Sequence, residues 1–194
     1  MPMVTHSDPF RISEYRTDWQ QGNDRENNGV IYTFGLNNET PDSYQIVTAI
    51  ANFAEQYASN SFVRGFVENL FPANMAPNDQ PTQYNAVASF VLTKLVYVAD
   101  PVGVEYLISP LKHLDNICMN GVSYGDCDDH VLLLNSMLGS IGFETHVVGV
   151  KANPSDELFN HVISLVNLGG KQYYFDGCNK TNPYQIPAGQ LLII

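Results

Sequence analysis

The chain has 194 residues, which is enough for one domain with a sizeable hydrophobic core. Its 20 acidic residues outnumber its 9 basic ones and give a formal net charge of −11 at pH 7. This sign argues against nucleic-acid binding, which needs basic patches, and against attraction to anionic membranes. The chain has 3 cysteines, an odd number, and no CxxC pair, so a disulfide framework is disfavoured. We therefore expect the protein to reside in a reducing compartment.

The first 40 residues are polar and rich in Asn, Asp and Gln, and only VIYTFG, from Val30 to Gly35, predicts a short strand. We therefore expect residues 1–40 to form a polar arm and residues 41–194 a single domain. The opening MPMVTHSDPF lacks the basic and apolar stretches of a secretory signal, and no apolar run reaches the length of a membrane span. These features predict a cytoplasmic protein that is not held in a membrane.

Apolar residues at helical spacing predict helices in the first half of the domain. TPDSYQIVTAIANFAEQYAS begins with Thr40 as a cap and Pro41 in the first turn. SFVRGFVENLF predicts a shorter helix, and DQPTQYNAVASFVLTKLVYVADP predicts a third that ends before Pro101. SPLKHLDNI can form a helical turn.

The pattern changes to strands after residue 142. FETHVVGVKA alternates and is rich in β-branched residues, and NHVISLVNL and KQYYFDGC predict two further strands joined by a hairpin turn at Gly169 and Gly170. Helices followed by an antiparallel sheet define an α+β fold class. The tail NPYQIPAGQLLII ends in apolar residues, so we expect contact with the core or with another chain to order it.

Between the helices and the strands lies GDCDDHVLLLNSM, in which Cys127 begins a strongly apolar helix. Asp126 can cap this helix, and Asp129 takes the third helical position as a variant of the capping box. Backbone N–H groups and the positive end of the helix dipole favour a thiolate on Cys127 and can stabilise an oxyanion. The neighbouring aspartates oppose the thiolate, which therefore needs a cation close by.

His161, at the start of the predicted strand HVISLV, is the candidate for that cation. A two-residue hairpin turn would place Cys178 opposite His161. The same register makes Asp176 a diagonal neighbour of His161 on one face of the sheet. An aspartate in that position can fix the tautomer of the ring, as the third member of a catalytic triad does.

The ordered segments GDC, THVVGV, NHVISLV and YYFDG resemble the transglutaminase-like cysteine-triad superfamily, and VYVADPVGVEYLISP resembles the segment before the cysteine of that family. His161 follows Cys127 by 34 residues, and Asp176 follows His161 by 15 residues. The resemblance covers roughly residues 84–177. It implies a papain-like core with these three residues as a triad. Members are mostly cofactor-free peptidases, amidases or acyl transferases that act on amide bonds through a thioester, and small relatives occur among phage structural genes.

Tyr97, in the VYVADP segment, is the candidate to complete an oxyanion hole with the backbone N–H of Cys127. Trp19 is the only tryptophan and lies in the predicted arm. Cys178 is a rival nucleophile because the predicted register places it opposite a histidine, whereas Cys118 is expected to be structural.

A metal site is a further alternative, with the borderline ligands Asp126, Cys127, Asp129 and His130. One helix cannot turn such near-consecutive residues toward a single ion, so this alternative is disfavoured. We expect Asp128 and Asp129 to be cap and surface charges, and His130 to satisfy a local backbone or carboxylate group. His113 belongs to no pattern that indicates a function.

The sequence thus predicts a cofactor-free thiol hydrolase or acyl transferase acting on a protein or peptide. Cys127 attacks an amide carbonyl, His161 carries the proton and Asp176 orients His161. The rival hypothesis is a structural component of a virion or similar assembly in which the triad is idle. The polar arm and the LLII end would then dock on partner proteins.

Overall fold

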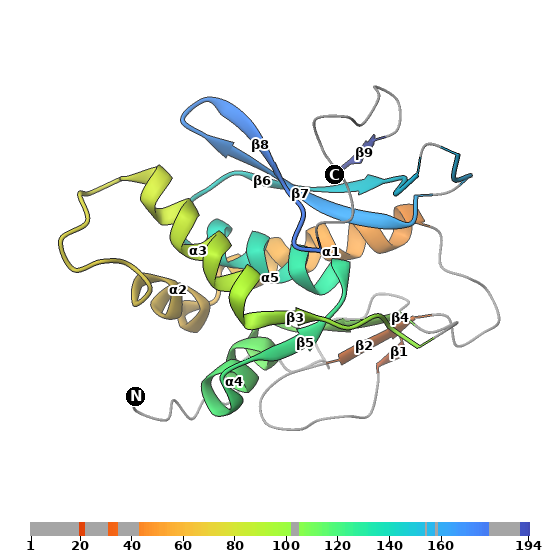
Figure 1. Ribbon diagram of the computed structural model, residues 1–194, viewed down its shortest axis with the longest axis horizontal. Helices are drawn as coiled ribbons and strands as arrows, with labels where there is room; N and C mark the ends of the chain where they lie inside the picture. The colour runs from red at the N-terminus through yellow and green to blue at the C-terminus, as the bar shows by residue number, and fades with distance from the viewer. Residues whose placement is uncertain are drawn as a thin grey trace.

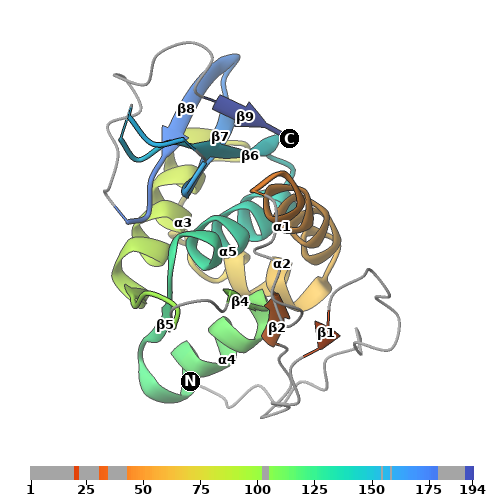
Figure 2. The ribbon, with the colours of Figure 1, turned by 90° about the vertical axis from the view of Figure 1, so that its right-hand side faces the viewer.

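The computed structural model describes residues 20–21, 31–34, 43–101, 105–153, 155–157, 159–178 and 191–194. Within these ranges the helices mostly precede the largest sheet along the chain, as the sequence predicts. Figures 1 and 2 show a layer of helices between a four-stranded sheet on one side and two smaller sheets on the other. No helix in the described part of the chain is both long and apolar enough to cross a membrane.

The helices form where apolar residues recur at helical spacing, and four of them have a side-chain N-cap. The caps of α2 to α5 are Asn60, Asp79, Ser109 and Asp126. SPLKHLDNI forms a longer helix than the single turn expected from it. The bounds are α1 Ser43–Ala58, α2 Ser61–Glu68, α3 Gln80–Lys94, α4 Pro110–Asn120 and α5 Cys127–Ser140. The predicted cap Thr40 lies outside the described residues.

The third predicted helix is shorter than expected. It ends at Lys94, and the VYVADP segment begins as strand β3, Leu95–Tyr97. β3 pairs in parallel with β5, Ser123–Gly125, the strand that leads directly into α5. The β-branched residues of this segment fit a strand, and the pairing partner comes from 28 positions further along the chain, beyond the reach of a local pattern.

The large sheet is antiparallel with the strand order β8-β7-β6-β9. Gly169 and Gly170 both have positive φ, 59° and 76°, as a two-residue hairpin turn of this hand requires. The predicted register is confirmed from Leu168–Lys171 to Ser164–Phe175. The bounds are β6 Thr145–Val150, β7 His161–Leu168, β8 Lys171–Phe175 and β9 Leu191–Ile193.

The two ends of the chain contribute strands to these sheets. β2, Ile31–Phe34, lies within the predicted VIYTFG strand and pairs with β4, Glu105–Ile108, and with β1, Gln20–Gln21. β9 forms the edge of the large sheet next to β6. Parts of the predicted arm and tail therefore pair with the domain. The boundary at residue 40 and the docking of either end on a partner stay predictions.

Helix α5 forms the centre of the hydrophobic core. Every residue from Asp128 to Leu138 is buried, because α1, α2, α3 and the large sheet all pack against this helix. Figure 2 shows α5 in the middle of the molecule with these elements around it. A helix that is buried on all sides has a fixed position and axis. Its first residue, Cys127, is half-buried, so the rigid core presents this thiol where the buried helix reaches the surface.

Candidate thiol site

The turn that carries Cys127 is built from a strand, a cap and a helix start. β5 ends at Gly125, and the carboxylate of Asp126 accepts a hydrogen bond from the backbone N–H of Asp128 at 3.3 Å. Cys127 is then the first residue of α5, as the sequence predicts. Gly125 is required at this point, because a Cβ there would lie only 2.6 Å from the Cβ of Asp129. The geometry puts the thiol at the helix N-terminus, where the dipole favours negative charge.

His161 and Asp176 come together as the hairpin register predicts. Nε2 of His161 lies 3.1 Å from Oδ1 of Asp176, and the two side chains are 1% and 4% exposed. The same Oδ1 atom accepts a hydrogen bond from the backbone N–H of Cys178 at 2.9 Å, which holds the carboxylate in place. Nδ1 of His161 is buried and makes no hydrogen bond within the described part of the chain. The ring is therefore oriented through one nitrogen, with the other uncommitted.

These residues meet near α5 because β7, which begins with His161, packs against that helix. The catalytic roles of Cys127, His161 and Asp176, including the approach of the thiol to the ring, stay a prediction.

Tyr97 is paired with Gly125 in the β3–β5 sheet, and its side chain is 38% exposed. Its place beside the Cys127 turn is compatible with the predicted oxyanion role, which also stays a prediction. Trp19 lies outside the described residues.

The expectation that Asp128 and Asp129 are surface charges is wrong. Both side chains are 1% exposed. Burial raises the pKa of Asp128 well above its usual value, and a hydrogen bond to Asp126 and the neighbouring negative charges add to this effect. Burial also raises the pKa of Asp129, although a nearby histidine and a backbone donor act in the opposite direction.

Asp129 belongs to a buried network that the sequence analysis missed. Its Oδ1 atom accepts a hydrogen bond from the backbone N–H of Ile108 at 2.7 Å and lies 3.3 Å from Nε2 of His113. Nδ1 of His113 lies 2.9 Å from the hydroxyl of Ser123. Asp129 therefore ties α5 to β4, α4 and β5 instead of completing a capping box. The local sequence around His113, LKHLDN, contains no pattern that indicates a partner 16 residues away.

His130 satisfies backbone groups, as expected, but one of them is distant in sequence. Its Nδ1 atom lies 2.6 Å from the carbonyl oxygen of Asp126, and its Nε2 atom lies 3.1 Å from that of Leu95.

Cys178 does not lie in a described strand pair with His161, because the described pairing of β7 with β8 ends at Phe175. The sulfur of Cys178 instead lies 3.9 Å from Nδ1 of His130.

The carboxylates of Asp126, Asp128 and Asp129 approach within 4.8 Å of one another, which is close enough to share a cation. This set differs from the ligands considered from sequence, since it excludes Cys127 and His130. Burial raises the pKa values of Asp128 and Asp129, which weakens both carboxyl groups as ligands for hard cations. Asp129 is also engaged by Ile108 and His113. These contacts occupy Oδ1 of Asp129, whereas Oδ2 of Asp128 and Oδ2 of Asp129 are buried without a hydrogen-bond partner among the described residues.

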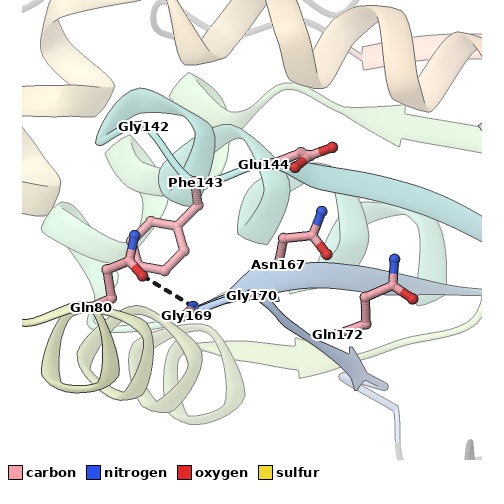
Figure 3. Close-up of a pocket in the computed structure, with 8 residues that line it drawn as sticks. All are labelled: Gln80, Gly142, Phe143, Glu144, Asn167, Gly169, Gly170 and Gln172. Atoms are coloured by element: carbon pink, nitrogen blue, oxygen red, sulfur yellow. Dashed lines mark hydrogen bonds between the residues drawn. The ribbon is translucent and has the colours of Figure 1, made fainter.

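A polar cavity of about 700 Å³ lies at the other end of α5, between α3, the α5–β6 connection and the β7–β8 hairpin. In Figure 3 the amide of Gln80 accepts a hydrogen bond from the backbone N–H of Gly169, at 3.1 Å. The lining residues are Gln80, Gly142, Phe143, Glu144, Asn167, Gly169, Gly170 and Gln172. None of the predicted site residues is among them, so this cavity is separate from the thiol site.

Neither family models nor curated proteins match this chain. A crystal structure of a "putative protease" from Parabacteroides distasonis ATCC 8503 superposes with a TM-score of 0.51 at 17% identity, over 77% of this chain and 29% of that one. A "putative cysteine protease" from Cytophaga hutchinsonii superposes with a TM-score of 0.47 at 14% identity, over 84% of this chain and 53% of that one. The chain thus spans about a third and about half of the two proteins. The first likeness confirms the predicted α+β fold class with a papain-like core.

Proposed function

We propose that the protein is a thiol-dependent hydrolase or acyl transferase of amide bonds, with Cys127 as nucleophile, His161 as general base and Asp176 as the residue that orients His161. The observation that carries this proposal is the buried His161–Asp176 hydrogen bond of 3.1 Å, in a strand that packs against the helix beginning with Cys127. The fold shared with a protein named a protease supports the choice of class.

In the proposed reaction His161 takes the proton of the Cys127 thiol on Nδ1, because Nε2 is engaged by Asp176. The sulfur forms a bond to the carbonyl carbon of the amide, and the resulting oxyanion is stabilised by backbone N–H groups at the start of α5. His161 returns the proton to the leaving nitrogen as the C–N bond breaks, which leaves a thioester on Cys127. Attack by water gives hydrolysis, and attack by an amine gives transfer; both regenerate the thiol.

Alkylation by iodoacetamide near pH 7, resolved by mass spectrometry of partly labelled protein, tests the nucleophile. We expect Cys127 to react about tenfold faster than Cys118 or Cys178, since its helix N-terminus and imidazole partner favour the thiolate. Cys118 is an internal control, because it is exposed on α4, yet partial desolvation and the charge of Asp115 raise the pKa of its thiol. Equal labelling of all three cysteines, or preferential labelling of Cys178, would show that the nucleophile is misassigned.

The structural role in an assembly is a second proposal, which the edge position of β9 favours. The chain end is held to β6 by two backbone hydrogen bonds, from the N–H of Val147 to the carbonyl of Ile194 at 2.9 Å and from the N–H of Ile194 to the carbonyl of Val147 at 3.0 Å. Ile193 is nevertheless 48% exposed. An exposed edge strand can pair with another chain. Light scattering of the full-length protein tests this idea, and a monomer at all concentrations would contradict it.

A further inference from the structure

His130 joins the three segments that make up the thiol site. It is the fourth residue of α5 and its side chain is 1% exposed. Nδ1 of the ring reaches back to the Asp126 carbonyl, in the turn before Cys127, and Nε2 reaches the Leu95 carbonyl at the start of β3. The face of the ring packs on Gly177, where an added Cβ would lie 2.6 Å from Cδ2 of His130. Gly177 follows Asp176 directly, so one ring fixes the helix turn and the loop that orients His161.

The hydrogen bonds of His130 determine its charge. Carbonyl oxygens only accept hydrogen bonds, and a neutral imidazole carries a single N–H. The separation of 2.6 Å between Nδ1 and the Asp126 oxygen requires a proton on Nδ1, and Nε2 also faces a carbonyl oxygen at 3.1 Å. A neutral ring would turn a lone pair toward one of these oxygens inside the core. Only the imidazolium satisfies both.

The charged groups around the ring favour the same state. Asp126, Asp128 and Asp129 lie on the same turn of the chain as His130, while Asp176 and the thiol of Cys178 belong to the segment after β8. β3 contributes the carbonyl oxygen of Leu95. None of these named groups can carry a positive charge, and each carboxyl group among them that is ionised stabilises a buried cation nearby.

We propose that His130 is held as an imidazolium and acts as a positioning residue for the thiol site. Its two N–H groups fix the Asp126–Cys127 turn against β3, and its ring fixes the Asp176 loop. Its positive charge offsets the aspartates that otherwise disfavour a thiolate on Cys127. The role toward Cys127 rests on the proposed function, whereas the charge of the ring does not.

Nitrogen NMR of the full-length protein labelled in histidine tests the charge directly. An imidazolium gives two ring nitrogens with similar shifts, and a neutral ring gives two widely separated ones. We expect the imidazolium pattern for His130 at pH 7 and pH 8. Through-bond correlations assign the ring in the wild-type protein, so the test does not depend on a variant that folds. Widely separated shifts at pH 7 would overturn the proposal.

The pH profile of Cys127 alkylation tests the positioning role. His130→Gln keeps one N–H donor group but removes the charge, and we expect its profile to move to higher pH, with alkylation of Cys127 about tenfold slower at pH 7. His146→Gln is the matched control: His146 lies on β6, 3.4 Å from Glu144, with its side chain 33% exposed. An unchanged profile in a folded His130→Gln protein overturns the role of His130.

The two proposals fail in different ways. If Cys127 of the wild-type protein is no more reactive than Cys118, the proposed function fails, and the nitrogen shifts still decide the charge of His130. If Cys127 is reactive and depends on His161, but not on His130, only the positioning proposal fails. Normal melting curves of each variant establish that the comparison is made on folded protein.

Discussion

Two histidine–aspartate pairs lie near the start of α5, and they differ in what the second ring nitrogen does. In the pair of His161 and Asp176, Nε2 contacts the carboxylate at 3.1 Å, and the buried Nδ1 makes no hydrogen bond within the described residues. In the pair of His113 and Asp129, Nε2 lies 3.3 Å from the carboxylate while Nδ1 contacts Ser123 at 2.9 Å. All four side chains are buried.

The difference teaches that a histidine–carboxylate pair is not by itself a sign of catalysis. In the His113 pair, Nδ1 contacts Ser123, and Nε2 lies at ion-pair distance from Asp129 without hydrogen-bond geometry. The carboxylate also accepts a hydrogen bond from the backbone of Ile108, so this network joins four segments of the chain. The His161 pair leaves one nitrogen available for a proton. The pair of His113 and Asp129 should therefore control stability, and the pair of His161 and Asp176 should control reactivity. Variants of each pair can separate the two effects.

The largest effect is expected from loss of His161. His161→Ala removes the general base, so acylation of Cys127 by an activated ester such as p-nitrophenyl acetate should slow by about 100-fold or more. Release of p-nitrophenolate in the first turnover measures this rate, with Cys127→Ser as the zero point. His113→Gln should retain most of the rate in protein that remains folded. A His161→Ala rate equal to that of the wild type would remove His161 from the mechanism.

The second effect concerns stability. Asp129→Ala leaves the N–H of Ile108 and the ring of His113 without their carboxylate partner, in a fully buried site. Breaking such a buried pair costs about 3–5 kcal/mol in the free energy of unfolding, which urea titration measures. Glu55→Ala, at an exposed position of α1, is the control and should stay within about 0.5 kcal/mol of the wild type. Equal midpoints for the two variants would contradict a structural role for Asp129.

A smaller loss is expected from a methyl group at the turn before Cys127. In Gly125→Ala the new Cβ meets the side chain of Asp129, and overpacking of this kind costs about 1–3 kcal/mol. Gly65→Ala, in α2, is the matched control, since nothing lies within 4 Å of its added Cβ. That variant should gain about 0.5–1 kcal/mol because alanine favours a helix over glycine. Thermal melts of the two variants should therefore shift in opposite directions.

The smallest effect is a change in the pH dependence of stability. Because the pKa of Asp128 is raised in the folded protein, the folded state holds a proton that the unfolded chain releases near pH 4. The stabilisation by this proton is complete below that pH and is lost as the pH rises through the folded pKa. Asp128→Asn removes the titration, so its free energy of unfolding should fall less between pH 5 and pH 8. Urea titrations at both pH values check this, and parallel changes in the two proteins would show that Asp128 is ionised when folded.

Local chemistry determined much of this site from the sequence alone. Gly169 and Gly170 set the hairpin turn, and its register predicted that His161 and Asp176 are neighbours; their side chains lie 3.1 Å apart, although the described pairing ends at Phe175. A small polar residue before an apolar helical pattern placed Cys127 at the start of α5. These inferences needed only neighbours in the chain or the period of a strand, which is why a single sequence sufficed.

Only the tertiary structure decided which polar groups are buried and what they contact. Asp129 looked like a surface charge because a helix start is commonly exposed, but α5 is enclosed on all sides and carries its first turn into the core. The partners of Asp129 and His130 are Ile108, His113 and Leu95, which lie 16 to 35 residues earlier in the chain. β3 likewise became a strand because β5 pairs with it. Contacts between distant segments leave no periodic trace in a sequence, so burial and hydrogen bonding at these positions follow from packing rather than from local pattern.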